Sequence, residues 1–123
     1  MGIYPCLTYR DIPAAIDWLS NAFGVDGRVL SAGGPGEGVD HAILTFRDAA
    51  ILVESERPEE LHGSHSGQGW VYVTVADADS HYQRARTAGA ADLGAPHTFG
   101  DGHRGYSTRD LEGNLWTFGT AAP

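Results

Sequence analysis

The stretch WVYVTV, residues 70–75, alternates aromatic or polar side chains with valines. Successive side chains of an extended strand point to opposite faces, so the three valines share one face and Trp70 and Tyr72 lie on the other. The same alternation in the opening strand adds Tyr4 and Cys6 to the second face. Aromatic walls with polar tips suit a planar, partly apolar ligand and attract cations. The pattern predicts a small-molecule binding surface, with packing in a collapsed cleft or a dimer interface as the alternative.

Three titratable side chains are further candidates for that surface. A shift of 62 residues sets His41 opposite His103, and each begins a predicted strand. Alternation in residues 51–54 directs Ile51 and Val53 toward a helix and leaves Glu54 on the other face. Glu54 is therefore a candidate general base for proton abstraction next to a carbonyl group. The alternative for the two histidines is a half-exposed position at the end of a strand.

Length and composition exclude several classes of protein. The 123 residues suffice for one domain, and 16 acidic against 8 basic residues give a net charge of −8, so we expect no nucleic acid partner. A single cysteine, Cys6, forms no intrachain disulfide and favours a reducing compartment. The sequence shows neither a secretion signal nor an apolar run of about 20 residues, which predicts a cytoplasmic protein without a membrane partner.

Two helices stand out between these strands. Apolar residues recur at helical spacing from Ile12 to Phe23, with Asp11 placed to cap the first turn and Gly24 to end the last. A second helix is predicted from Ala78 to about residue 88. Its predicted N-cap is Asp77 or Asp79, and Gly89 is predicted to end it.

The two halves of the chain repeat one order of elements. Extended stretches at 3–9 and 70–75 precede the helices, and strand-like runs at 28–32, 40–46, 50–55, 91–99, 105–109 and 115–119 follow them. Shifts of 66 and 62 residues superpose parts of the two halves, which indicates a duplicated β-α-β-β-β module. We expect a single α+β domain over 1–123, with module one at about 1–60, a linker at about 61–68 and module two at about 69–121.

Three segments resemble the vicinal oxygen chelate superfamily, which includes glyoxalase I, extradiol dioxygenases, fosfomycin resistance proteins and bleomycin-binding proteins. They are LTYRDIPAAIDWLSNAFG (7–24), VTVADADSHYQRARTAGA (73–90) and RDLEGNLWTFGT (109–120). The last resembles the family's DPdG turn before the final strand, with Leu111 where proline is usual. The resemblance implies two tandem βαβββ modules that form a curved cleft with the helices outside, and it implies a homodimer.

The family's enzymes hold a divalent metal with one side chain from the first and last strand of each module. The resemblance maps these positions onto Tyr4, Trp70 and Thr117, and the fourth onto Val53 or, by alternation, Glu54. An indole and neutral hydroxyl groups are poor ligands for a divalent ion. We therefore expect no metal and no cofactor, and we count Thr117 among the ligand-binding candidates.

Two functions follow from the resemblance and the residues. The first is a metal-independent binding protein of the bleomycin-resistance type, which sequesters an aromatic and cationic ligand such as an antibiotic. The alternative is a glyoxalase-like lyase or isomerase that uses a non-standard metal site and Glu54 as the base. Acidic charge, the aromatic candidates and the lack of metal donors favour the first.

Overall fold

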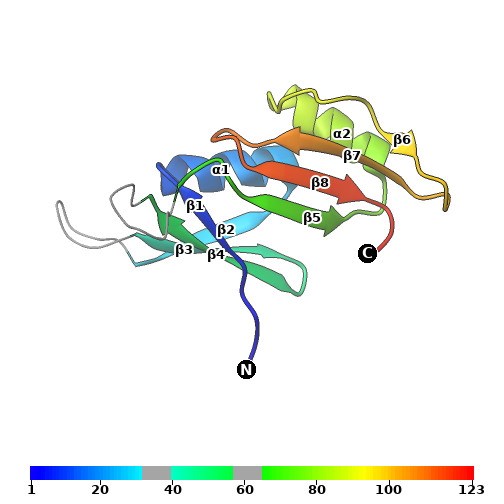
Figure 1. Ribbon diagram of the computed structural model, residues 1–123. Helices are drawn as coiled ribbons and strands as arrows, with labels where there is room; N and C mark the ends of the chain where they lie inside the picture. Colours follow the sequence, from blue (N-terminus) through cyan, green and yellow to red (C-terminus); the bar gives the residue numbers. More distant parts are fainter. Residues whose placement is uncertain (32–39, 57–64) are drawn as a thin grey trace.

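Two modules with the same order of elements make up the protein (Figure 1). The computed structural model describes residues 1–31, 40–56 and 65–123. Module one contains β1 (Cys6–Tyr9), α1 (Ile12–Phe23), β2 (Asp26–Ser31), β3 (His41–Phe46) and β4 (Ala49–Ser55). Module two contains β5 (Trp70–Thr74), α2 (Ala78–Thr87), β6 (His97–Thr98), β7 (Arg104–Arg109) and β8 (Leu115–Gly119).

Each module forms its own four-stranded mixed sheet. The strand orders are β1-β4-β3-β2 and β5-β8-β7-β6, with the first strand of each module parallel to its last. The structure therefore confirms the α+β class and the duplicated βαβββ module. The first part of the predicted linker, 61–64, lies outside the described residues.

The helices agree with the sequence pattern. The side chain of Asp11 accepts a hydrogen bond from the N–H of Ala14, and Gly24 ends α1 in the left-handed region at φ 74°. Asp77, one of the two predicted caps, accepts from the N–H of Ser80 at the start of α2. Helix α2 ends at Thr87, one residue before the predicted boundary.

Two strand predictions were wrong in their extent. Strand β1 begins at Cys6 rather than at residue 3, so Tyr4 precedes the strand, although the carbonyl of Pro5 still accepts from the N–H of Leu52. Strand β6 contains only two residues instead of the nine expected over 91–99. Gly94 adopts a positive φ of 126° and Pro96 has no N–H to donate, which leaves little chain able to pair.

The two modules share one hydrophobic core. The ring of Phe23, the last residue of α1, lies 5.2 Å from the ring of Trp116 and 4.9 Å from that of Phe118, both on β8 of the other module. All three side chains are buried. Helix α1 therefore packs against the sheet of module two as well as its own. We call the opposite face of each sheet, turned away from this core, its outer face.

The turn before β8 fastens the modules together. Oδ2 of Asp110 accepts hydrogen bonds from the hydroxyl of Tyr9 at 2.5 Å and from Nε1 of Trp116 at 2.9 Å. Oδ1 of Asp110 accepts from the N–H groups of Glu112 and Asn114, and Gly113 adopts a positive φ of 94°. The turn is thus part of the architecture of the domain.

Candidate functional site

The outer face of the second sheet carries a partly exposed aromatic surface. Trp70 is 70% exposed, and its Nε1 donates a hydrogen bond to Oγ1 of Thr117 at 3.0 Å. The hydroxyl groups of Thr117 and Ser107 lie 2.9 Å apart on the neighbouring strands β8 and β7. The hydrogen bond fixes the indole on the sheet while leaving most of its surface in solvent. Such an arrangement offers a flat apolar face with hydroxyl groups beside it.

Two paired glycines support the next aromatic rings. Gly105 and Gly119 face each other across β7 and β8. A Cβ atom at Gly119 would overlap the phenol of Tyr72, and a Cβ at Gly105 would lie 3.3 Å from Phe99. The rings of Tyr72 and Phe99 therefore lie in the space that side chains would occupy at these two positions. The hydroxyl of Tyr72 also donates to the carbonyl of Ala121 at 2.6 Å, which holds its ring in place.

Two histidines extend the surface beyond Phe99. The ring of His103 stacks on Phe99 with the centroids 4.4 Å apart and an angle of 15° between the planes. The ring of His97 lies 4.3 Å from Phe99. Nδ1 of His103 contacts the carboxylate of Asp101, and hydrogen bonding to His103 lowers the pKa of Asp101. We call the surface formed by Trp70, Tyr72, Thr117, Phe99 and the two histidines the aromatic face.

The outer face of the first sheet carries the remaining candidates. Nε2 of His41 lies 3.4 Å from Oε1 of Glu54, its partner across β3 and β4. Val53 is buried on the other face, so alternation assigns Glu54 to the outer face as the sequence indicated. Cys6 is exposed and lies opposite Leu52 on this sheet.

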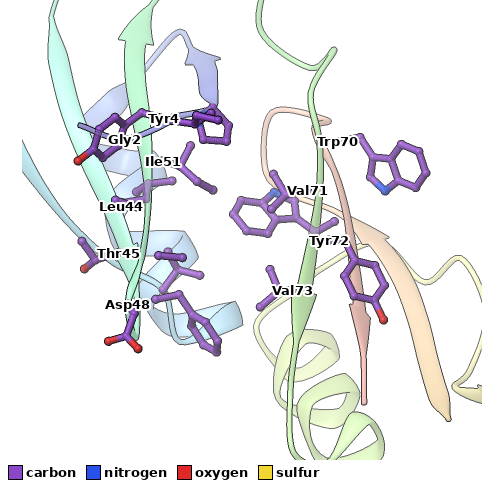
Figure 2. A pocket seen from close by; sticks show the side chains of 17 residues that line it. Gly2, Tyr4, Leu44, Thr45, Asp48, Ile51, Trp70, Val71, Tyr72 and Val73 are labelled. Carbon is purple, nitrogen blue, oxygen red and sulfur yellow. The ribbon is translucent and has the colours of Figure 1, made fainter. Parts of the chain in front are cut away.

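A cavity of about 620 Å³ separates module one from β5 (Figure 2). All four residues from Trp70 to Val73 line this space, but Figure 2 shows the side chains of Val71 and Val73 pointing into it and the rings of Trp70 and Tyr72 pointing to the opposite side of β5. The cavity walls are mainly apolar and include Leu44, Ile51 and Trp116. Tyr4 lines this cavity rather than the aromatic face, because it precedes β1.

The candidate residues therefore fall into three places. Trp70, Tyr72, His103 and Thr117 belong to the aromatic face of module two. His41, Glu54 and Cys6 belong to the first sheet, and Tyr4 belongs to the cavity. A ligand-binding role for each of them stays a prediction.

Three of the positions that the resemblance maps onto the family's metal ligands, Tyr4, Trp70 and Thr117, carry poor donors for a divalent ion. The indole N–H of Trp70 donates to the hydroxyl of Thr117, so these two positions bond to each other and offer no anionic or imidazole donor. Tyr4 precedes β1, so the alternation of that strand does not direct its side chain toward Trp70 and Thr117. Within the described ranges, no group of three or more His, Cys, Asp or Glu side chains is arranged to hold a metal ion.

Sequence reasoning missed two features near these sites. Phe99 was predicted to belong to a long strand. The only sequence signal for its position over the sheet was Gly105 on the neighbouring strand, because a glycine has no side chain and leaves room for the ring of Phe99. His81 carried no argument from sequence, yet its Nδ1 lies 2.5 Å from the hydroxyl of Tyr106 and its Nε2 lies 3.0 Å from the carbonyl of Phe23. Both ring nitrogens of His81 thus have partners within the domain, which indicates a structural role, and burial lowers the pKa of its imidazole.

Among the described residues, no helix has the length and apolar character needed to cross a membrane.

Arg104 on β7 forms two hydrogen bonds to the carboxylate of Asp79, at 2.9 and 2.8 Å. The ion pair raises the pKa of Arg104 and lowers that of Asp79. The guanidinium group therefore joins α2 to β7.

Solved structures of other proteins resemble this chain over almost its whole length. The chain is 34% identical to TioX from Micromonospora sp. ML1, whose crystal structure superposes with a TM-score of 0.70 over 96% of this chain and 98% of that one. A superfamily member from Sphaerobacter thermophilus DSM 20745 is 17% identical, with a TM-score of 0.73 over 97% of both chains.

A glyoxalase I variant from Zea mays is 15% identical, with a TM-score of 0.72, and the match covers 98% of this chain but 45% of that one. A search of curated proteins found no match. The family model described as Glyoxalase/Bleomycin resistance protein/Dioxygenase superfamily matches residues 4–118. The protein therefore belongs to the glyoxalase, bleomycin resistance protein and dioxygenase superfamily.

Proposed function

We propose that the protein is a metal-independent binding protein that sequesters an aromatic small molecule, such as an antibiotic, on the aromatic face. The observation that carries this proposal is the exposure of the three aromatic side chains of the aromatic face. Trp70, Tyr72 and Phe99 are 70%, 38% and 40% exposed, although large apolar side chains are normally buried. A planar ligand stacked on them would remove this apolar surface from water.

Charge favours a cationic group on the ligand. The chain has a net charge of −8, which raises the concentration of cations near the surface. Exposed indole and phenol rings also attract cations through their negative faces. Anionic aromatic molecules lack both contributions, so we expect them to bind more weakly.

The family supports binding of a drug-like ligand without identifying one. The family model includes bleomycin resistance proteins in its description, and TioX is similar over almost the whole chain. The poor metal donors at Trp70 and Thr117 favour a metal-independent role over that of a metal-dependent enzyme of the same fold. Sequestration requires no reacting group, only a surface that fits the ligand.

Titration with an aromatic cation, an aromatic anion and an aliphatic cation tests the proposal. Ethidium, a planar aromatic cation, should bind with one site per chain and quench the fluorescence of Trp70. Fluorescein, an aromatic anion, and hexyltrimethylammonium, an aliphatic cation, should bind at least about tenfold more weakly, which corresponds to about 1.4 kcal/mol. Bleomycin is tested in the same way. Failure of both ethidium and bleomycin to saturate the protein contradicts the proposal.

The alternative is a glyoxalase-like lyase or isomerase with a non-standard metal site. Glu54 lies against His41, so a carboxylate and an imidazole stand together on the first sheet. His103 is a member of the aromatic face of the other module, where it contacts Asp101. Exchange of the proton next to a carbonyl in deuterated water, measured with added Ni²⁺, Zn²⁺ or Mn²⁺ and abolished in Glu54→Gln, would favour this alternative.

We further propose that the protein acts in the cytoplasm as a homodimer. A single cysteine, which forms no intrachain disulfide, suits a reducing compartment. Strands β1 and β5 each lie at an edge of their sheets, and a twofold interface would cover such edges. Light scattering after size exclusion should give twice the mass of the 13.1 kDa chain. A mass of one chain at micromolar concentration contradicts the dimer.

A further inference from the structure

Three polar side chains form a row across the outer face of the first sheet. Ser31 on β2 pairs with His41 on β3, and His41 pairs with Glu54 on β4. Oγ of Ser31 lies 3.4 Å from Nδ1 of His41, and Oε1 of Glu54 lies 3.4 Å from Nε2 of the same ring. One imidazole therefore contacts a hydroxyl group with one nitrogen and a carboxylate with the other.

An irregularity in β2 places Ser31 in this row. The register between β2 and β3 shifts between Val29 and Ser31, and regular alternation from Arg28 would have set Leu30 opposite His41 instead. Leu30 is exposed and takes the extra position. The bulge thus exchanges an apolar side chain for a hydroxyl group beside the imidazole. Bulges commonly redirect side chains in this way next to active sites.

The chemistry of the row is that of an activated nucleophile. Glu54 favours the tautomer of His41 with the proton on Nε2, which leaves the lone pair of Nδ1 toward the hydroxyl of Ser31. A nucleophile in contact with a base, itself oriented by a third group, is the arrangement that supports covalent catalysis, and such contacts are often longer without substrate. The His41 side chain is 35% exposed, so a substrate can approach it.

We propose that Ser31, His41 and Glu54 form a nucleophilic site that hydrolyses small carboxylic esters. Oγ of Ser31 bonds to the ester carbonyl carbon while its proton passes to Nδ1 of His41. The carbon–oxygen bond to the alcohol then breaks, and that proton leaves with the alcohol. Water repeats the two steps on the acyl group of Ser31, which releases a carboxylic acid and restores the serine. Ser31 and His41 act directly, and Glu54 is a positioning residue.

The same face supplies a cation for the substrate. Arg28 pairs with Ile43, so it lies on the outer face of β2 on the same side as Ser31. A guanidinium group there favours esters whose acid portion carries a carboxylate or another acceptor. This activity belongs to module one and is independent of ligand binding on the aromatic face of module two.

Labelling with a fluorophosphonate tests the proposal directly. The reagent bonds to activated serine oxygens with loss of fluoride, and tandem mass spectrometry of the wild-type protein should place the label on Ser31. A label on another residue, or no label under conditions that modify chymotrypsin, would overturn the proposal. The wild-type result decides the matter even where a variant folds poorly.

Variants then assign the roles. Hydrolysis of p-nitrophenyl acetate should fall to the uncatalysed rate in Ser31→Ala and by about 10²-fold in His41→Gln. Glu54→Gln should slow labelling of Ser31 and lower kcat with little change in KM, because the carboxylate no longer orients the imidazole of His41, and Glu54→Asp should restore part of the rate. Ser80→Ala is the matched control, since this α2 hydroxyl donates to the main-chain carbonyl of Asp77. Unchanged hydrolysis in Ser31→Ala overturns the proposal.

Discussion

The hydroxyl group of Tyr9 donates a hydrogen bond to Oδ2 of Asp110 at 2.5 Å, across 101 residues of sequence. Tyr9 ends β1, and Asp110 begins the turn before β8, so this bond joins the two modules inside their shared core. Burial and the nearby carboxylate raise the pKa of Tyr9, which keeps its hydroxyl group protonated as a donor.

Replacement of Tyr9 with Phe should therefore destabilise the whole domain. The buried carboxylate of Asp110 would lose one donor while keeping that from Trp116, which costs about 1–3 kcal/mol of unfolding free energy. Urea unfolding followed by circular dichroism measures the change. Tyr4→Phe is the control, because Tyr4 is 62% exposed and should leave stability unchanged. Equal stabilities of the two variants would show that the bond to Asp110 contributes nothing.

Removal of the exposed indole should separate binding from folding. Trp70→Ala should abolish binding of ethidium while leaving the unfolding transition in place, because the side chain lies on the outer face and is 70% exposed. Fluorescence anisotropy of the dye measures binding. Val73→Ala is the comparison, since this residue points to the opposite side of β5 and should affect stability more than binding (Figure 2). Unchanged affinity in Trp70→Ala would exclude the aromatic face as the site.

The paired glycines should respond differently to alanine. In Gly119→Ala the new methyl group displaces the phenol of Tyr72, whose ring can move once its hydrogen bond to Ala121 breaks, so we expect weaker ligand binding and a loss of stability of about 1–3 kcal/mol. Combination with Tyr72→Ala should remove most of that loss, as a double-mutant cycle would measure. In Gly105→Ala the methyl lies 2.9 Å from the main-chain oxygen of Phe118, which cannot move freely, so the loss should be greater. A smaller loss at position 105 contradicts this reasoning.

Acid should weaken the domain through His81. Burial lowers the pKa of this imidazole from its ordinary 6.5, with Arg84 adding to the effect. The unfolded chain therefore binds a proton at a higher pH than the folded one, and stability falls as the pH drops below about 6.5 toward the folded pKa. Urea unfolding at pH 7.5 and pH 5.5 should show this loss in the wild type and less of it in His81→Gln. The carboxylates with lowered pKa values, Glu56, Asp79 and Asp101, act at more acidic pH.

The purified protein should contain far less than one metal ion per chain. Trp70 and Thr117, which we map onto two of the family's ligand positions, are hydrogen-bonded to each other, and their indole and hydroxyl groups bind divalent ions poorly. Mass spectrometry of metal content, before and after dialysis against a chelator, checks this. One tightly held equivalent of Ni²⁺, Zn²⁺ or Mn²⁺ would contradict our mapping of those positions and favour the enzyme.

Local signals determined the elements that the sequence predicted well. Asp11 and Gly24 mark the ends of α1 because capping depends on residues within one turn of the helix. Alternation assigned Trp70 and Tyr72 to one face of β5 for the same reason. The extent of β6 and the position of Tyr4 were wrong, since strand length depends on which partner is available for hydrogen bonding.

Contacts between residues far apart in the chain could not be predicted from the sequence. The ring of Phe99 over Gly105 depends on a loop that returns to its own sheet. The contact between Ser31 and His41 depends on a bulge, and no alternating pattern in β2 indicates where the extra residue falls. The repeat nevertheless placed His41 at the start of its strand. The sequence therefore indicated the histidine of this contact but not the serine.

Oε1 and Oε2 of Glu112 accept hydrogen bonds from the main-chain N–H groups of Arg10 and Asp11, at 2.6 and 3.0 Å. The junction between β1 and α1 thus obtains its partners about one hundred residues later. On the ribosome, the first module emerges long before the carboxylate that satisfies its backbone. Together with the core that Phe23 shares with Trp116 and Phe118, these bonds make module one depend on the last strand, so we expect folding to be one late, cooperative event rather than two successive ones.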